Sequence, residues 1–307
     1  MTGDEKLFDV VIIGSGPAGM SASIWCADLG LDAIVVEGSD EVGGGLLRIH
    51  NPIANYPGVT TQNGREMRDI FQRHSQNSGV LMRLSSTVTR IDPDHGTVDL
   101  SSGRILRGKY ILLATGVRRR TLGLAGEERF KGRGILDSGA RDPGSVHGMN
   151  VAVVGGGDAA AENAAILSKF AKHVYLIHRG DKLSARDELA EMALAAPNVT
   201  FLSGRNVQQM NGRDALESID IATRDGKIEN VQIERAIFRI GVLPNSELLA
   251  GVVSRDKNGY ILTDNYGRTD RESIFAAGDV SSPISPTIVT AAGQAAAAIK
   301  FIRTRLR

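Results

Sequence analysis

Two segments of the chain carry glycines at a spacing that brings protein backbone close to a pyrophosphate. They are Gly14-Ser-Gly16-Pro-Ala-Gly19 and Gly155-Gly-Gly157-Asp-Ala-Ala160, each between an apolar run and a helical pattern. Backbone N–H groups at the start of such a helix can bind an anion. Each apolar run that follows ends 23 residues after the first glycine (14 to 37 and 155 to 178), at Glu37 and at His178. The matched spacing predicts two dinucleotide-binding units.

The residue at each of these strand ends indicates which nucleotide the unit takes. Glu37 can accept hydrogen bonds from adenosine ribose hydroxyls and would repel a 2′-phosphate, so the first unit suits FAD or NAD. The second strand instead ends in His178-Arg179, with Lys182 and Arg186 close behind. These cations favour NADPH as the second nucleotide, and a solvated basic loop is the alternative interpretation.

A third strand end favours a flavin in the first unit. Asp279 follows Gly278 at the end of the apolar run 274–280. Its carboxylate can accept hydrogen bonds from the hydroxyls of a ribityl chain, while capping a turn is the alternative role. Together the sites imply a flavin in one domain and a nicotinamide donor in the other.

The strands and helices expected around these residues predict an α/β fold. We expect two Rossmann-like dinucleotide-binding domains, each with three layers (ββα), the second inserted into the first. The FAD domain is predicted to be residues 1–117 and 247–307, and the NAD(P) domain residues 118–246. The supporting patterns are strands at 9–14, 33–36, 110–114, 150–154, 174–177 and 274–280, a hairpin of 97–100 with 105–110, and helices at 20–29, 162–170 and 287–304.

Composition excludes several classes of protein. The 307 residues carry a formal charge of +1, which removes the attraction of a strongly basic protein for nucleic acid or anionic membrane. No run of about 18 apolar residues is present, and the acidic N-terminus is not typical of a signal peptide, so a cytoplasmic protein is expected. A single cysteine, Cys26, excludes an internal disulfide, a CxxC redox pair and a cysteine-rich metal site. The six histidines show no metal-ligand spacing.

Several motifs lie along the chain, the two glycine loops included. They are Val11–Gly19, Gly43-Gly44, Asn55-Tyr-Pro-Gly58, Leu113-Ala-Thr-Gly116, Leu122–Gly134, Val153–Gly157, Ile177-His-Arg179, Ile240-Gly241 with Pro244-Asn245, and Phe275–Val280. With these motifs the chain resembles the low-molecular-weight thioredoxin reductase family. The resemblance implies a homodimeric FAD protein with an inserted NADPH domain, whose rotation presents the nicotinamide and a CxxC disulfide to the flavin in turn.

The resemblance extends the expected cofactor contacts to further residues of both units. The residues expected at FAD are Gly14, Ser15, Gly16, Pro17, Ala18, Gly19, Glu37, Gly38, Gly44, Gly45, Leu46, Asn55, Val88, Ala114, Thr115, Gly116, Gly278, Asp279, Thr287 and Ile288. Those expected at NAD(P), or at another second nucleotide, are Gly155, Gly156, Gly157, Asp158, Ala159, His178, Arg179, Arg186, Ile240 and Gly241.

The chain departs from the family where the family does its chemistry. Where the family carries Cys-x-x-Cys-Asp, this chain has Ser138-Gly-Ala-Arg141-Asp142. Near the flavin, the usual Gln is Gly45 and the usual Arg-Gln is Pro286-Thr287, which opens space for another acceptor or reflects drift. Ser138, Arg141, Asp142 and His50, in the loop beside the flavin, are the candidate residues near the reacting centre. Cys26 is expected to be an inert core thiol.

The nucleotide domain departs as well. The family's His-Arg-Arg-x-x-x-Arg becomes His178-Arg-Gly180 with Ser184, so the 2′-phosphate clamp is incomplete. NADPH remains favoured, while NADH, a second flavin or no pyridine nucleotide stay open. Arg118-Arg119-Arg120 suits an acidic partner such as ferredoxin, or a solvated linker.

We therefore predict an FAD-dependent oxidoreductase that passes electrons from NAD(P)H through FAD directly to a small-molecule or small redox-protein acceptor. A homodimer without metal, membrane or nucleic-acid partners is expected. The alternatives are a flavoprotein independent of pyridine nucleotide, linked to ferredoxin or acting as a small-molecule oxidase, and a non-catalytic flavin-binding sensor.

Overall fold

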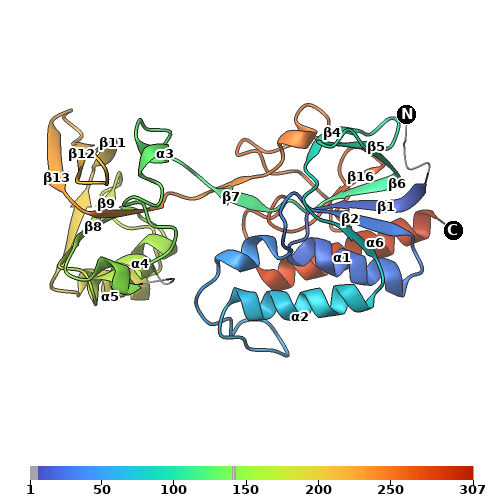
Figure 1. The fold of residues 1–307 in the computed structure, drawn as a ribbon, viewed down its shortest axis with the longest axis horizontal. Coiled ribbons are helices and arrows are strands. Elements are labelled where there is room, and N and C mark those ends of the chain that lie inside the picture. The colour runs from blue at the N-terminus through green and yellow to red at the C-terminus, as the bar shows by residue number, and fades with distance from the viewer. Residues whose placement is uncertain (1–5, 140, 142, 307) are drawn as a thin grey trace. The chain divides into compact units, whose positions relative to one another are not determined.

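The chain divides into two compact units. A computed structural model describes residues 6–139, 141 and 143–306 (Figure 1). Unit 1 comprises Met1–Arg118 with Leu243–Arg307, and unit 2 comprises Arg119–Val242. The sequence placed these boundaries after residues 117 and 246. The chain crosses between the units in β7 (Val117–Arg119) and β15 (Val242–Pro244), which pair as a two-stranded sheet.

Unit 1 is built on one sheet, in the strand order β3-β2-β1-β6-β5-β4, with β16 paired to β6. Parallel strands form its centre, and β4 and β5 add an antiparallel edge. The strands are β1 (Leu7–Ile13), β2 (Ala33–Val36), β3 (Leu81–Arg83), β4 (Val88–Asp92), β5 (Thr97–Leu100), β6 (Ile105–Leu113) and β16 (Ile274–Ala276).

The central strands of unit 1 are apolar on both faces because both faces are covered. Val10 and Ile12 pack with α1 and α6, while Val11 and Ile13 pack with β4, β5 and the chain at 249–261. Figure 1 shows the unit's long helices together on one side of the strands. The helices are α1 (Pro17–Asp28), α2 (Gly64–Asn77) and α6 (Ile288–Arg305), with short 3-10 turns η1 (Gly44–Arg48) and η3 (Glu247–Leu249).

Two expected strands of unit 1 differ in extent. The hairpin strand at 105–110 and the buried strand at 110–114 are one continuous strand, β6, which alternates between exposed and buried residues before becoming fully buried. The expected strand at 274–280 ends at Ala276, because Gly278 turns the chain with a φ of 83°.

Unit 2 repeats the layered design around a smaller parallel sheet in the order β10-β9-β8-β14. One face packs on α4 and α5, and the other packs on the antiparallel sheet β11-β12-β13. The elements are α3 (Glu127–Phe130), η2 (Pro143–Val146), β8 (Asn150–Gly155), α4 (Asp158–Ser168), β9 (His173–His178), α5 (Asp187–Leu194), β10 (Val199–Ser203), β11 (Asn206–Asn211), β12 (Ser218–Ala222), β13 (Ile228–Gln232) and β14 (Arg235–Arg239).

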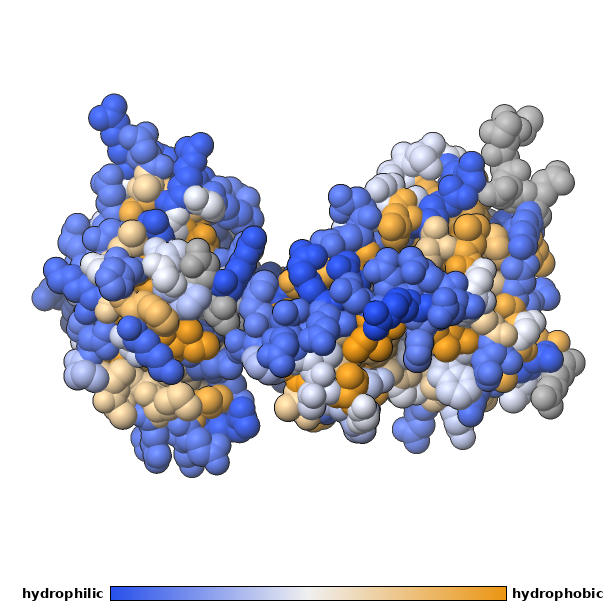
Figure 2. Space-filling view, turned by 60° about the horizontal axis from the view of Figure 1, so that its bottom comes forward, coloured by the Kyte–Doolittle hydropathy of each residue, from blue (hydrophilic) through white to orange (hydrophobic). Residues whose placement is uncertain are grey.

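The surface of each unit mixes apolar and polar side chains on the face seen in Figure 2. Ile284, in the loop before α6, is 96% exposed. No helix in the described part of the chain has the length and apolar character needed to cross a bilayer.

Candidate functional site

The carboxyl ends of the parallel strands of unit 1 lie in register at one edge of the sheet. Ile13 pairs with Val36 and with Leu113, and Leu113 pairs with Ala276. Ligands of open parallel sheets bind at this edge. The residues that follow the four ends are those expected at FAD: Gly14, Glu37, Ala114 and, after one alanine, Gly278-Asp279.

The three glycines of the first loop have different surroundings. A Cβ on Gly14 would lie 2.5 Å from the Ala114 carbonyl oxygen, and one on Gly19 would lie 1.8 Å from the Gly14 oxygen, so both are needed for close packing. A Cβ on Gly16 would meet no atom within 4 Å. Gly16 is the N-cap of α1, which has no side-chain cap and no acid in its first turn. The arrangement leaves an open cradle at the positive end of a helix dipole, which fits a pyrophosphate.

Glu37 is held beside this cradle by hydrogen bonds to its carboxylate. Ser15 donates its backbone N–H (2.8 Å) and its hydroxyl (2.7 Å) to Oε2, and the Ser39 N–H donates to Oε1 at 2.9 Å. The carboxylate is thereby fixed at the end of β2 with acceptor capacity left for ribose hydroxyls.

Asp279 is a half-buried carboxylate whose oxygens have no hydrogen-bond partner among the described residues. Burial raises the pKa of Asp279. The preceding Gly278 lies against the start of α1, where its Cβ would stand 3.1 Å from the Ala18 Cβ. A carboxylate that is partly removed from water gains from added hydrogen-bond donors, and ribityl hydroxyls are suitable donors.

The Gly43–Gly45 tract closes the cradle from another side. The Gly43 N–H donates to the Ser15 carbonyl at 3.0 Å, and a Cβ on Gly44 would lie 3.2 Å from the Gly16 Cα. A Cβ on Gly45 would meet nothing within 4 Å. The space that a glutamine side chain would enter from this position is therefore open.

Other residues expected at FAD lie around the same edge in varied roles. Thr115 donates its hydroxyl to the Asn245 carbonyl at 2.6 Å, and Thr287 caps α6 by accepting from the Thr290 N–H at 3.2 Å. Gly38 and Asn55 are exposed, and His50 is half-buried after η1. Leu46 and Ile288 belong to one apolar cluster, while Val88 packs against the core under β1.

The second glycine loop follows the same design. A Cβ on Gly155, whose φ is 144°, would lie 2.2 Å from the Arg239 carbonyl oxygen. A Cβ on Gly157 would approach nothing closer than the Ser184 Oγ at 4.0 Å, and buried Ala160 takes the third position. The start of α4 is thus open to a pyrophosphate, as the start of α1 is.

His178 occupies a slot between two glycines. A Cβ on Gly156 would lie 2.4 Å from the ring's Cε1, and one on Gly180 would lie 2.8 Å from Nε2. Neither glycine has a positive φ, so the ring is what requires them. Burial, followed by the Arg179 charge, lowers the pKa of His178, and the ring is neutral at pH 7. Sequence reasoning missed this packing, although Gly180 in place of the family's arginine is its signal.

Arg186 is committed to Asp158 at the start of α4. Its backbone N–H donates to Oδ1 and its Nε to Oδ2, both at 2.8 Å. These bonds lower the pKa of Asp158. Arg179 is the exposed cation left directly at the strand end. Ala159, in α4, and Gly241, after β14, are also exposed, and Ile240 is half-buried.

The segment that replaces the CxxC motif is attached to unit 2. The Gly139 N–H donates to Asn163 Oδ1 at 3.0 Å, and Asn163 Nδ2 donates to the Ala159 carbonyl at 2.6 Å. Arg239 Nη2 donates to the Asp137 carbonyl at 2.9 Å. Ser138 is half-buried and Arg141 is exposed, and Asp142 lies outside the described residues.

Cys26 is an inert core thiol, as predicted. It lies in α1 with no exposed surface, packed against the sheet. Burial, and to a smaller extent the Asp9 charge, raises the pKa of Cys26 to about 12. Among the described residues, no group of three His, Cys, Asp or Glu side chains has the arrangement of a metal site.

The comparisons with known proteins agree with this geometry. The family described as pyridine nucleotide-disulphide oxidoreductase matches residues 8–295. A thioredoxin reductase of Listeria innocua is 31% identical over 295 residues, covering 95% of this chain and 92% of that protein. An NADH dehydrogenase of Bacillus subtilis is 30% identical over 297 residues, which is 96% of this chain and 58% of that protein.

Solved structures confirm the predicted fold. The Lactococcus lactis thioredoxin reductase in its FR conformation, with 30% identity, superposes with a TM-score of 0.85 over 97% of this chain and 98% of that one. That structure has two Rossmann-like domains, as the sequence predicted here. The bacillithiol disulfide reductase of Bacillus cereus shares the fold at 19% identity, with a TM-score of 0.81 over 98% of this chain and 100% of that one.

Proposed function

Since the chain belongs to the pyridine nucleotide-disulphide oxidoreductase family, as a flavin-dependent oxidoreductase of the thioredoxin reductase-like group, we propose that it passes electrons from NAD(P)H through FAD directly to an acceptor. The family binds FAD and NAD(P)H. A bound flavin would supply the hydride and electron chemistry, and the protein would supply binding, orientation and electrostatics.

The observation that carries this proposal is the open cradle at Gly16, which has a carboxylate beyond the ends of two other strands of the same sheet. Glu37 would bind the adenosine ribose, and the α1 start would bind the pyrophosphate. Asp279 would bind the ribityl chain. These three groups come from different strand ends of one sheet edge and suit the successive parts of FAD.

Direct transfer to an acceptor follows from the sulfur content of the chain. Its only cysteine, Cys26, lies in α1 and is buried in the hydrophobic core. Ser138 and Arg141 stand where the family places its redox pair, and neither carries sulfur. The acceptor must therefore receive electrons without a protein disulfide as intermediate. The open space at Gly45 is where we expect it to approach.

The second loop is proposed to bind the nicotinamide nucleotide. Gly157 leaves the start of α4 open, and Arg179 is exposed at the strand end. Neutral His178 would face the adenosine ribose without charge. A nicotinamide-independent flavoprotein is the second candidate, because Arg186 is bound to Asp158 and the ring of His178 fills the slot beside the loop.

Anaerobic rapid mixing of the flavin-loaded protein with NADPH or NADH separates the candidates. Loss of the flavin's visible absorbance within seconds supports the proposed function. No bleaching by either nucleotide, but bleaching by reduced ferredoxin or a small-molecule substrate, supports the second candidate. A protein inert to every donor would be a flavin-binding sensor. A colourless protein that cannot be reconstituted with FAD contradicts all of these functions.

Assembly and location complete the proposal. We expect a homodimer in the cytoplasm, with the acceptor a small molecule or small redox protein. Light scattering on the purified protein gives the oligomeric state.

A further inference from the structure

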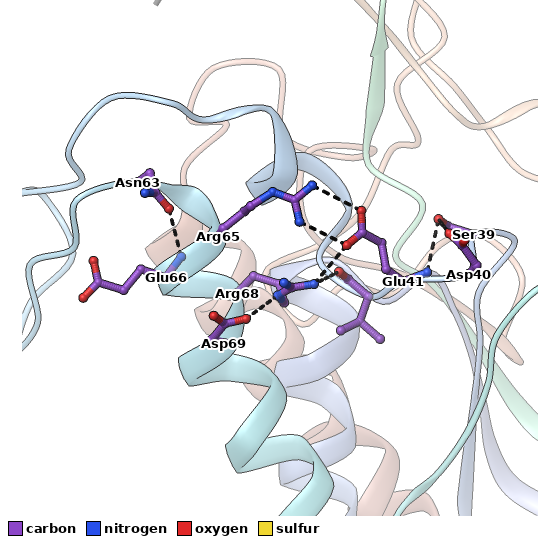
Figure 3. Close-up of polar contacts among 9 residues, drawn as sticks. Ser39, Asp40, Glu41, Asn63, Arg65, Glu66, Arg68 and Asp69 are labelled. Carbon is purple, nitrogen blue, oxygen red and sulfur yellow. Dashed lines mark hydrogen bonds and ion pairs between the residues drawn. The ribbon is translucent and has the colours of Figure 1, made fainter. Parts of the chain in front are cut away.

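Two arginines of α2 bind the acidic residue that precedes the Gly43–Gly45 tract. Arg65 Nη1 lies 3.2 Å from Glu41 Oε2, and Arg68 Nη1 lies 3.2 Å from the same oxygen. Figure 3 shows both guanidinium groups converging on this carboxylate from one helix. The shared contact attaches the loop after β2 to α2.

Arg68 is the more deeply placed of the two. Its side chain is 15% exposed, whereas that of Arg65 is 57% exposed. Arg68 Nε also donates to Asp69 Oδ1 at 2.6 Å, and its Nη1 lies 3.5 Å from the Val42 carbonyl. A guanidinium that is mostly removed from water is screened less than an exposed one, so the Arg68 contacts are the stronger restraint.

The stem of Arg68 lies directly against the glycine tract. A Cβ on Gly43 would lie 2.6 Å from the Arg68 Cγ, and the φ of Gly43 is 125°. The Arg68 side chain therefore occupies the space beside Gly43 that any larger residue would need. The other two of the three atoms nearest to such a Cβ belong to Leu47, both at 3.2 Å.

Gly43 in turn bears on the cradle. Its N–H donates to the Ser15 carbonyl at 3.0 Å, and the next glycine packs against Gly16. Ser15 carries both hydrogen bonds to Glu37 Oε2. A continuous set of contacts thus runs from Arg68 through Gly43 and Ser15 to the carboxylate expected at the ribose.

We propose that Arg68 is a positioning residue for the dinucleotide loop of unit 1, holding Gly43 against Ser15 so that the cradle is ready to bind FAD. Arg68 contacts Glu41 and Gly43 and acts on FAD only through them. The proposal rests on the proposed function, in that unit 1 is taken to hold FAD.

The experiment compares Arg68→Met with Arg65→Met in the full-length FAD-loaded protein. Methionine keeps an unbranched stem against Gly43 but removes the guanidinium, and Arg65→Met removes the other partner of Glu41 as a matched control. FAD release after dilution is followed by the rise in flavin fluorescence. Arg68→Met is expected to release FAD at least about tenfold faster, Arg65→Met within about twofold of wild type, and Arg68→Lys between them.

Two further measurements separate positioning from general stability. Raising the ionic strength should speed FAD release more in the wild type than in Arg68→Met, because the variant has lost the Arg68–Glu41 ion pair and keeps only that of Arg65. The Tm of the flavin-free protein should be similar in Arg68→Met and Arg65→Met. Should Arg68→Met not fold, Arg68→Lys and Glu41→Gln carry the same comparison.

Equal FAD release from wild type and Arg68→Met, or equal acceleration in both methionine variants, would overturn the inference alone. A drop in the Tm of flavin-free Arg68→Met with unchanged release would also overturn it. A wild-type protein that never holds FAD would overturn the proposed function and this inference together.

Discussion

The imidazole of His178 lies so close to Gly156 that a single added Cβ would stand 2.4 Å from its Cε1. In unit 1 the matching positions are Glu37 and Ser15, which meet through hydrogen bonds instead. The two units thus use one backbone design with opposite chemistry at the ribose position. An acid is held by donors in one unit, and a neutral ring is held by van der Waals contact in the other.

Gly180→Ala should expel the ring from its slot. The new Cβ would stand 2.8 Å from Nε2, so the imidazole must turn towards solvent and the variant loses about 1–3 kcal/mol of stability. The pKa of His178 then returns towards its ordinary value, which NMR titration of the ring measures. Gly293→Ala, where a Cβ meets nothing, is the control. An unchanged His178 pKa in Gly180→Ala would show that the ring is held elsewhere.

The pH dependence of stability should carry a contribution from His178. Burial lowers the folded-state pKa of this ring, so its stabilising contribution is present above the ordinary value of 6.5 and is lost as pH falls through the lowered value. Wild type should therefore lose more stability than His178→Gln between neutral and mildly acid pH. Chemical unfolding at several pH values measures the difference, with His74→Gln on the exposed face of α2 as the control. Parallel curves for wild type and His178→Gln would contradict this.

Arg179 and Arg186 should affect nucleotides differently. Arg179→Ala is expected to raise the KM for NADPH about tenfold and leave that for NADH unchanged, because only NADPH offers a 2′-phosphate. Arg186→Ala should raise both, since it leaves the Asp158 carboxylate without its partner at the start of α4. Steady-state kinetics with an artificial electron acceptor gives these values, with Lys172→Ala, an exposed lysine at the other end of β9, as the control. An equal effect of Arg179→Ala on both nucleotides would refute the assignment.

Asp279→Asn should change stability and FAD binding in opposite directions. Because burial raises the pKa of Asp279, the stability linked to its protonation is lost as pH rises above the ordinary value of 3.8 through the folded one. The flavin-free asparagine variant should therefore have the higher Tm at pH 7, with the gap closing in acid. FAD affinity should fall about tenfold as a charged acceptor is lost. A variant that is less stable and binds FAD normally would identify Asp279 as a turn cap.

Cys26 should not react with thiol reagents in the native protein. A thiol with a pKa of about 12 is almost wholly protonated at pH 8, and it has no exposed surface. We expect no reaction with a disulfide reagent until denaturant is added, and then one thiol per chain. Incubation with NADPH should leave both counts unchanged. A native protein that gains a reactive thiol, or that reduces thioredoxin, would contradict direct transfer.

The glycine loops and strand ends could be predicted because their signals are local. Each signal lies within a short stretch of sequence: an apolar run before Gly14 or Gly155, the glycines of the loop, and the acid Glu37 at the end of the next strand. The three-layer arrangement followed from repeating that unit, and the insertion of one domain into the other followed from the order of the elements along the chain.

The contacts that could not be predicted join residues far apart in sequence. Arg68 meets Glu41 across 27 positions and Arg186 meets Asp158 across 28, and neither pairing has a local signature. Arg186 was predicted to be a phosphate ligand from its charge and its place near the strand end. The sequence pattern does not show that Asp158 binds it. The slot for His178 depends on side-chain packing against two glycines, which a pattern of residue types does not specify.

The missing sulfur pair limits how many electrons the protein can store. Asn163 fixes the Ser138 segment to α4 with no redox group in it. A flavin beside a dithiol stores two electron pairs, whereas a flavin alone stores one. After one donor molecule has reduced the flavin, the flavin must pass its electron pair to the acceptor before a second donor can react. Full reduction under anaerobic titration would then consume a single equivalent of NAD(P)H per bound flavin.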